Sequence, residues 1–251
     1  MVKIGSATLT HETGRLNLRR LERLAAVLSD LANRGLEIVL VSSGAVSAGM
    51  AKLELTSRPR EVDEIQACAA VGQAELMFIY ERAFGLFGRK IAQILLTRDA
   101  VDVPARRANA EAIFATILRF GCLPIVNEND AISSEEIKFS GNDILSAYVA
   151  RLCRADLLVN LTDQGGLYTA DPRKSPEAKL IRHVPELTDE IFDCAGGAGT
   201  ERGTGGAYSK LEAALIAAAY DIPTIIARGA DPAVLYDICD GRVEGTYIGK
   251  I

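Results

Sequence analysis

The sequence has 251 residues, of which 49% are hydrophobic and 24% are charged, a composition that is ordinary for a globular enzyme with a full core. Its net charge of −5 and pI of about 5.3 argue against a nucleic-acid-binding protein, which usually carries a basic stripe. No apolar run approaches the roughly 18 residues that cross a bilayer, and the chain starts without a signal h-region, so we expect a cytoplasmic enzyme with no membrane partner.

Two residue types that often carry catalysis are scarce. The only histidines are His11 and His183, and His183 lies in a polar connecting stretch, so His-based triads and zinc sites are poorly supported. The five cysteines are odd in number and form no Cys-x-x-Cys pair. Each lies in or beside an apolar stretch, which predicts buried thiols in a reducing compartment.

Short apolar runs alternate with longer helical segments along the chain. In chain order, we predict strands at Met1–Ile4, Glu37–Val41, Ile91–Leu96, Leu123–Val126, Leu157–Leu161 and Pro223–Ala227. We predict helices from Leu18 to Leu31 with a stop at Gly35, over Val62–Phe87 as one helix or two joined near Gly72, and over Ala105–Phe120, Ile144–Cys153, Ser209–Tyr220 and Ala233–Asp240.

This alternation predicts the fold class. Strand–helix–strand order indicates an α/β protein with a mainly parallel central sheet and helices on both faces. Ligands of such sheets bind outside the carboxyl ends of the strands. Four polar residues follow predicted strands and are expected to converge on one rim: Lys3, Ser43, Asp130 and Asp163.

The first motif is Lys3-Ile4-Gly5-Ser6, in which a lysine ends a strand and a glycine follows. An edge lysine with an ordinary turn glycine would explain the string. A lysine within a buried strand is costly, however, unless an anion meets it. Similarly, Ser42-Ser43-Gly44-Ala45 opens a helix after an apolar strand. Its serine is either a plain N-cap or part of a helix N-terminus that binds a carboxylate or phosphate.

Two further strings carry carboxylates and amides. Asn127-Glu128-Asn129-Asp130 follows a predicted strand, and it is either a turn or a cluster that recognises the ammonium group of an amino acid. Of these two interpretations, we favour a cluster that recognises the ammonium group of an amino acid. In Gly141-Asn142-Asp143, the aspartate is either a helix cap or a carboxylate held between cationic groups that it orients.

The second half of the chain holds the two remaining motifs. Leu161-Thr162-Asp163 leads into a Gly-Gly turn that closes at Asp171-Pro172. The glycine-rich stretch from Gly203 runs into a helix whose first turn carries Lys210, and it matches neither a Walker A nor a dinucleotide-binding pattern. It is either a flexible loop or a clamp in which Lys210 reaches a phosphate. Glycines let backbone N–H groups approach a phosphoryl group closely, and the lysines beside them supply positive charge. This combination favours phosphoryl transfer.

Taken in order, these strings resemble the amino acid kinase family, and within it the members that phosphorylate glutamate. The resemblance covers nearly the whole chain. It rests on Lys3-Ile4-Gly5-Ser6, Val41-Ser42-Ser43-Gly44-Ala45, Ile94-Leu95-Leu96-Thr97, Asn127-Glu128-Asn129-Asp130-Ala131, Asn142-Asp143, Leu161-Thr162-Asp163, Gly166-Leu167-Tyr168-Thr169-Ala170-Asp171-Pro172-Arg173, and Gly203-Thr204-Gly205-Gly206 with Lys210. Related kinases for N-acetylglutamate or UMP usually show three glycines where this chain has Ser43-Gly44-Ala45.

The resemblance implies a three-layer αβα sandwich and an ATP- and Mg²⁺-dependent phosphorylation of the γ-carboxylate of L-glutamate, the first step of proline biosynthesis. It implies that Lys3 and Lys210 flank the transferred phosphoryl group and that Asp143 orients both lysines. The implied substrate-binding residues are Ser43, Gly44, Ala45, Asp130 and Asn142. The implied ATP-binding residues are Lys3, Gly5, Ser6, Thr162, Asp163, Gly203, Thr204, Gly205, Gly206 and Lys210.

The resemblance also implies one kinase domain over residues 1–251, with an acceptor-binding lobe over about 1–155 and an ATP-binding lobe over about 156–251. Many members carry a C-terminal PUA domain, which we expect to be missing here. Expected partners are proline as feedback inhibitor, a glutamyl phosphate reductase downstream and further copies of the chain in a dimer or tetramer. Where members commonly show Gly-Asp, this chain has Ser140-Gly141 and so lacks one carboxylate near the glutamate or metal site.

Two alternatives stay open from the sequence. One is another amino acid kinase with a different carboxylate or phosphate as acceptor. The other is a non-catalytic nucleotide or amino-acid sensor on the same fold, for which the loss of a lysine would be expected, whereas both Lys3 and Lys210 are present.

Overall fold

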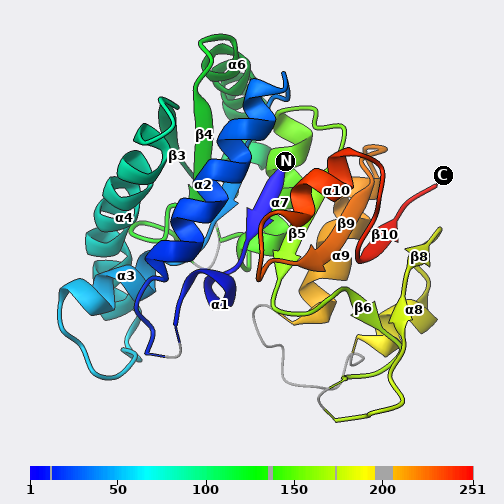
Figure 1. The fold of residues 1–251 in the computed structure, drawn as a ribbon. Helices are drawn as coiled ribbons and strands as arrows, with labels where there is room; N and C mark the ends of the chain where they lie inside the picture. The colour runs from blue at the N-terminus through cyan, green and yellow to red at the C-terminus, as the bar shows by residue number, and fades with distance from the viewer. Residues whose placement is uncertain (12, 135–137, 173, 196–205, 251) are drawn as a thin grey trace.

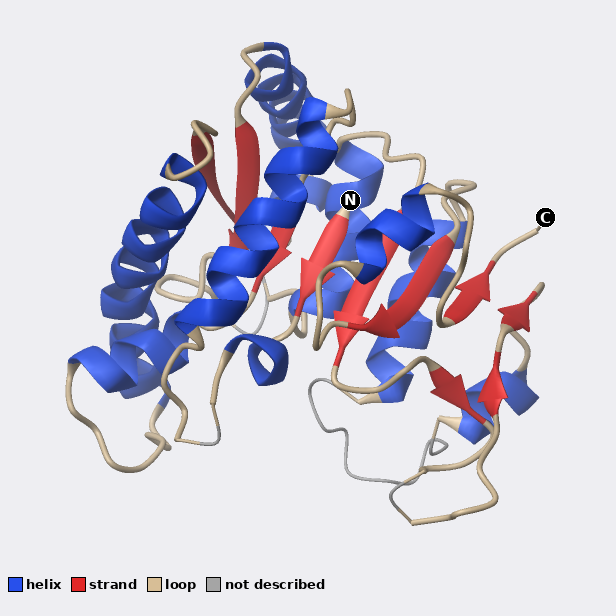
Figure 2. Cartoon of the chain, viewed as in Figure 1, coloured by secondary structure: helices blue, strands red, loops and turns tan. Residues whose placement is uncertain are grey.

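A computed structural model describes residues 1–11, 13–134, 138–172, 174–195 and 206–250, and within them an eight-stranded sheet forms the centre of the molecule (Figures 1 and 2). Its strand order is β3-β4-β2-β1-β5-β9-β10-β8. The strands are β1 (Val2–Ile4), β2 (Leu40–Ser42), β3 (Ile91–Leu96), β4 (Leu123–Glu128), β5 (Leu158–Thr162), β8 (His183–Val184), β9 (Thr224–Arg228) and β10 (Thr246–Ile248). Within the described residues of this sheet, neighbouring strands run parallel except for the antiparallel pair β9 and β10, which confirms the predicted mainly parallel sheet.

Helices cover both faces of the sheet. One face packs against α2 (Leu18–Asn33), α4 (Val62–Gly85) and α10 (Val234–Cys239). The other packs against α6 (Pro104–Arg119), α7 (Asn142–Leu152) and α9 (Ala207–Ala218). The predicted three-layer αβα arrangement is therefore confirmed. Shorter elements are α1 (Ser6–Leu9), α3 (Ala45–Lys52), α5 (Asp99–Asp102), α8 (Asp189–Cys194) and the small antiparallel pair β6 (Leu167–Tyr168) with β7 (Leu180–Ile181).

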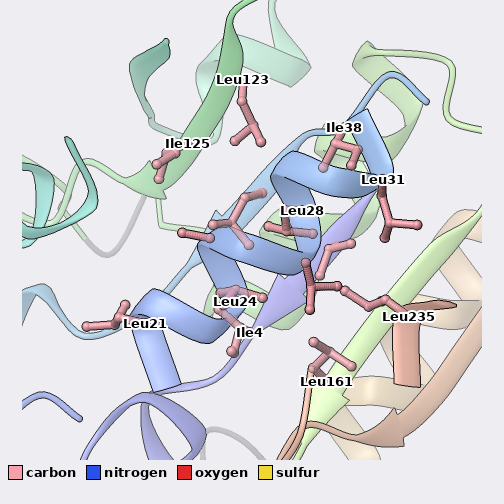
Figure 3. Close-up of a cluster of buried hydrophobic side chains, with 14 of the residues drawn as sticks. Ile4, Leu21, Leu24, Leu28, Leu31, Ile38, Leu123, Ile125, Leu161 and Leu235 are labelled. Atoms are coloured by element: carbon pink, nitrogen blue, oxygen red, sulfur yellow. The ribbon is translucent and has the colours of Figure 1, made fainter. Parts of the chain in front are cut away.

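The core on the α2 face follows directly from the leucine spacing of that helix (Figure 3). Leu21, Leu24 and Leu28 recur every three or four residues, so they share one face of the helix, and each is fully buried. They pack in the same cluster as Ile4 and Leu161 from the central strands. Burying a leucine side chain stabilises the fold by about 1.5–3 kcal/mol, so this layer fixes the sheet on which the polar residues sit.

The alternation along the strands decides where the polar residues point. Because successive strand residues face opposite sides of a sheet, the burial of Ile4 and Leu161 under α2 turns Lys3 and Asn160 toward α7 and α9. The register of β1 and β5 places Lys3 directly beside Asn160. Two polar residues from neighbouring strands therefore meet on the same face.

Helices α3 and α4 cross in direct backbone contact. A Cβ atom on Gly72 of α4 would lie 1.8 Å from the carbonyl oxygen of Ala45, and one on Gly49 of α3 would lie 1.8 Å from that of Cys68. Only glycine fits at either position. The structure also shows that α4 continues as one helix through Gly72, of the two arrangements that the sequence left open.

Element boundaries differ from the prediction in a few places. β2 begins at Leu40 rather than Glu37, because its pairing with β1 starts where Val2 faces Leu40. β6, β7, β8 and β10 were not predicted, because their two or three residues are too few to show a period in the sequence. His183 consequently lies in β8, paired with β10, and not in a connecting stretch as predicted.

The prediction that all five thiols are buried is wrong. Cys68 is buried, whereas Cys122, Cys153 and Cys194 are partly buried and Cys239 is exposed. Cys194 and Cys239 end their helices and Cys153 directly follows α7, and such element ends lie near the surface. All five are free thiols. Among the described residues, every helix is too short or too polar to span a membrane.

Candidate active site

The carboxyl ends of four adjacent parallel strands form one rim of the sheet. In spatial order β4, β2, β1 and β5 end at Glu128, Ser42, Ile4 and Thr162. The N-terminus of α7 reaches the same rim, where the Asn142 side chain donates a hydrogen bond to the carbonyl oxygen of Ser42 at 3.1 Å. The rim is where the fold rule for parallel sheets places a ligand.

A cluster of two lysines and one aspartate occupies the centre of this rim. Lys3 Nζ lies 2.5 Å from Asp143 Oδ1, and Lys210 Nζ lies 3.2 Å from Asp143 Oδ2. The three residues come from β1, α7 and α9 and are at most 5% exposed. Residues more than 200 positions apart in sequence therefore share one carboxylate.

The electrostatics of the cluster follow from this arrangement. Burial alone would raise the pKa of Asp143, but the ammonium groups of Lys3 and Lys210 outweigh it and hold the pKa of this carboxyl well below its usual range. Burial lowers the pKa of Lys3. The charge of the neighbouring Lys210 lowers this pKa further, whereas the carboxylate of Asp143 raises it. Asp143 is therefore an anion at neutral pH.

Two residues that were not predicted as site residues complete the surroundings of Asp143. Asn160 Nδ2 donates to Asp143 Oδ1 at 3.0 Å, and Ser209 Oγ donates to Asp143 Oδ2 at 2.8 Å. Asn160 is fully buried. It interrupts an apolar strand just as Lys3 does, so the same signal was available for it. With four partners, the carboxylate of Asp143 is held in one orientation.

The predicted acceptor-binding residues gather on the β2 side of the cluster. Asn142 Nδ2 lies 3.0 Å from Ser43 Oγ and 2.8 Å from Asn127 Oδ1. Gly44 caps α3 with a φ of 112°, a left-handed conformation that favours glycine, and Ala45 is the first residue of that helix. The structure thus brings Ser43, Gly44, Ala45 and Asn142 together.

Asp130 lies in a cavity of about 310 Å³ that opens beside these residues. The cavity is lined from α3, α4, β3, the end of β4 and the segment after it, and Ala45, Gln73 and Glu128 are among its lining residues. Burial raises the pKa of Glu128 and that of Asp130. The positive charges of Lys138 and Arg58 partly offset this rise in the pKa of Asp130. Two carboxyl groups in one small cavity suit a cationic group such as an ammonium.

The predicted nucleotide-binding residues lie on the β1, β5 and α9 side. Gly5 caps α1, and a Cβ atom there would lie 3.4 Å from Lys3 Nζ. Gly206 caps α9, and its carbonyl oxygen accepts a hydrogen bond from Lys210 Nζ at 3.3 Å. Thr162 Oγ1 donates to Asp163 Oδ1 at 2.9 Å.

The remaining predicted positions divide into two groups. Ser6 and Asp163 are exposed beyond the strand ends and make no contact with the Asp143 cluster within the described residues. Gly203, Thr204 and Gly205 lie outside the described residues. Within the described ranges, no group of three or more His, Cys, Asp or Glu side chains is placed to hold a metal ion.

The sequence profile of the amino acid kinase family matches residues 1–228, and this chain belongs to that family. Among its curated relatives is the glutamate 5-kinase of Clostridium perfringens, which is 48% identical, with 100% of this chain and 95% of the relative covered. The glutamate 5-kinase of Listeria welshimeri is 44% identical, with 100% and 92% covered. The glutamate 5-kinase of Carboxydothermus hydrogenoformans is 50% identical, and the match covers 98% of this chain and 66% of that longer relative.

Solved structures share the fold at much lower identity. Carbamate kinase from Giardia lamblia bound to AMP-PNP superposes with a TM-score of 0.70 at 14% identity, with 100% of this chain and 98% of that chain covered. A product complex of T. acidophilum isopentenyl phosphate kinase gives a TM-score of 0.66 at 18% identity, with 98% of each chain covered. These likenesses confirm the predicted fold.

Proposed function

We propose that this chain transfers the terminal phosphoryl group of ATP to the γ-carboxylate of L-glutamate, giving L-glutamyl 5-phosphate and ADP, the first step of proline biosynthesis. Identity of 44–50% to curated glutamate 5-kinases supports the substrate pair. The observation that carries the proposal is the buried Lys3–Asp143–Lys210 cluster, with the Ser43–Asn142 group directly beside it.

The chemistry matches these groups. A carboxylate is already ionised at pH 7, so its oxygen can attack the γ-phosphorus without a general base. One oxygen–phosphorus bond forms as the bond to the β-phosphate breaks, and ADP leaves with that electron pair. The barrier comes mainly from bringing two anions together, and ammonium groups fixed in a dry site reduce it.

Each site residue receives a role in this proposal. Lys3 and Lys210 stabilise the charge on the transferring group, and Asp143 holds both lysines in place. Ser43, Gly44, Ala45 and Asn142 bind glutamate at its γ-carboxylate end, and Asp130 binds its ammonium group. ATP is bound by Gly5, Ser6, Thr162, Asp163 and the stretch from Gly203 to Gly206, with both lysines at its phosphates.

We propose that Mg²⁺ enters as part of the substrate, bound to ATP. The described residues support this, because the one carboxylate at the centre of the site, Asp143, is already engaged by Lys3, Lys210, Asn160 and Ser209. Mg²⁺ commonly keeps several waters and binds through substrate phosphates, where it neutralises charge on the nucleotide.

The product and the pathway suggest further partners. An acyl phosphate is reactive, so we propose a glutamyl phosphate reductase that consumes it directly, proline as feedback inhibitor, and a homo-oligomeric enzyme. We also propose a cytoplasmic location, since all five thiols are free and reducing compartments keep thiols in that state.

Trapping with hydroxylamine tests the proposed activity. Hydroxylamine converts an acyl phosphate to a stable hydroxamate, and we expect γ-glutamyl hydroxamate that requires glutamate, ATP and Mg²⁺ together. A panel of other carboxylate and phosphate acceptors runs in parallel. Faster turnover of another acceptor would assign a different kinase activity, and calorimetric binding of ATP and glutamate without any product would assign a sensor.

A further inference from the structure

Three side-chain amides form a continuous hydrogen-bonded chain from α7 to α4. Asn142 Nδ2 donates to Asn127 Oδ1 at 2.8 Å, and Asn127 Nδ2 donates to Gln73 Oε1 at 3.0 Å. Asn142 adjoins Asp143, so this chain runs from the lysine–aspartate cluster to the cavity that Gln73 and Asp130 line.

Backbone groups fix the direction of every amide in this chain. The backbone N–H of Glu128, which can only donate, lies 2.9 Å from Asn127 Oδ1. At the other end, the carbonyl oxygen of Ser42, which can only accept, lies 3.1 Å from Asn142 Nδ2. Asn127 must therefore direct its NH₂ group to Gln73, and the side-chain oxygen of Gln73 must accept that hydrogen bond.

It follows that Gln73 keeps its own NH₂ group for the cavity. Among the described residues, no acceptor takes a hydrogen bond from Gln73 Nε2. The rest of the polar wall includes the carboxyl groups of Glu128 and Asp130, and the neighbouring walls Ala69, Ala70 and Ala74 are small and apolar. The side chains of Gln93 and Asn129 also line the cavity, but Gln73 is the lining amide that the hydrogen-bonded chain orients, so its N–H donors are directed into a cavity that holds two carboxyl groups.

The backbone around Gln73 is rigidly placed. The preceding residue, Gly72, is the point where α4 meets the first turn of α3, at the carbonyl oxygen of Ala45. The same contact sets α3, whose N-terminus follows Ser43 and Gly44. The position of Gln73 relative to the acceptor-binding residues is therefore fixed by packing.

We propose that Gln73 is a specificity-determining residue whose NH₂ group binds the α-carboxylate of the amino-acid acceptor. This inference rests on the proposed function, in which the γ-carboxylate lies beside Asn142 and Asp143. The far end of such a molecule then extends along the amide chain toward Gln73, where Asp130 takes the ammonium group and Gln73 takes the carboxylate.

Two substitutions at Gln73 separate the loss of donors from the addition of charge. Gln73→Met keeps the length of the side chain and removes the donors, whereas Gln73→Glu keeps the oxygen that Asn127 needs and replaces Nε2 with an anionic oxygen. By calorimetry without ATP, we expect both to raise the Kd for L-glutamate about 10- to 100-fold. The Kd for 4-aminobutyrate, which lacks the α-carboxylate, should change less than about 3-fold, since it makes no use of Gln73.

Gln93→Glu is the matched control, since Gln93 lines the same cavity from β3 and takes no part in the amide chain. We expect it to change the Kd for glutamate by less than about 3-fold. The inference is overturned if Gln73→Met binds glutamate like the wild type, if both ligands weaken equally, or if Gln93→Glu matches Gln73→Glu. Thermal unfolding and binding of an ATP analogue check that each variant is folded. Glutamate that binds normally but yields no hydroxamate would instead overturn the proposed function alone.

Discussion

Asp143 is the residue on which the site converges. Its two oxygens are shared between Lys3 and Lys210, and Asn160 and Ser209 add a hydrogen bond to each. Two buried ammonium groups repel each other, so the carboxylate between them is what allows both to stay at one place. In the proposed function, the two lysines are therefore already in place for the transferring phosphoryl group and need no rearrangement during the reaction.

The first prediction concerns the two lysines. Lys3→Ala and Lys210→Ala should each lower kcat by about 100-fold or more and leave the KM for glutamate within about 3-fold, because their charge matters most in the transition state. Steady-state kinetics with hydroxamate detection measures both constants. A variant that keeps wild-type turnover would remove that lysine from its role.

The second prediction concerns the pH dependence of stability. The pKa of Asp143 in the folded chain lies below the value of about 3.9 for an unfolded aspartate, so its contribution is complete above that value and is lost as the pH falls through the folded pKa. Asp143→Asn should therefore cost about 3–5 kcal/mol at pH 7. Denaturant unfolding of both proteins from pH 7 to pH 3 should show the difference shrinking below about pH 4. A difference that is constant with pH would contradict the ion-pair account.

Signals at single residues in the sequence predicted only part of this site. Lys3 was identifiable because a lysine in a buried strand needs an anion, and Asn160 broke its apolar strand in the same way but was overlooked. Gln73 had no such signal, since a glutamine in a long helix is ordinary. Its importance depends on backbone groups of Glu128 and Ser42 that only the folded chain places nearby.

At the level of elements, the crossing of α3 and α4 connects packing to the site. Gly72 and Gly49 let the two helices touch through their backbones. Because α3 begins directly after the Ser43-Gly44 turn, a displacement of α4 would move both Gln73 and the proposed acceptor-binding residues. The crossing therefore fixes the relative positions of these residues.

The third prediction tests this crossing. Gly72→Ala puts a methyl group 1.8 Å from the carbonyl oxygen of Ala45, so we expect about 1–3 kcal/mol of destabilisation and a higher KM for glutamate. Gly85→Ala is the control in the same helix, with nothing within 4 Å of the added methyl group, and should stabilise the chain by about 0.5–1 kcal/mol. Denaturant unfolding and kinetics measure both effects. Equal behaviour of the two variants would refute the tight crossing.

The elements that the sequence predicted well share a physical property. The bounds of β3, α2, α4 and α6 match the prediction closely, because α2 has an apolar stripe with a helical period and β3, α4 and α6 are long for their type of element. β8 and β10 have two and three residues, so their pairing depends on tertiary contacts rather than on any local pattern. The division into lobes near residue 155 stays a prediction.

At the scale of the whole molecule, an acidic chain concentrates positive charge at one place. The net charge is −5, yet two buried lysines meet at the centre of the rim of the sheet. The layers on both faces fix that rim, with the proposed acceptor-binding residues on the β2 and β4 side and the proposed nucleotide-binding residues on the β5 and α9 side. In the proposed function, the two substrates bind on opposite sides of the cluster and meet at Lys3 and Lys210.

The fate of the carboxylate oxygen tests this account most directly. The wild-type chain is given ATP, Mg²⁺, hydroxylamine and L-glutamate labelled with ¹⁸O in its γ-carboxylate, and the released phosphate is analysed by ³¹P NMR. If the γ-carboxylate attacks the phosphorus, hydroxylamine cleaves the carbon–oxygen bond of the acyl phosphate, and each phosphate released carries one ¹⁸O atom. Release of unlabelled phosphate alone would contradict the account, because water rather than glutamate would then have received the phosphoryl group.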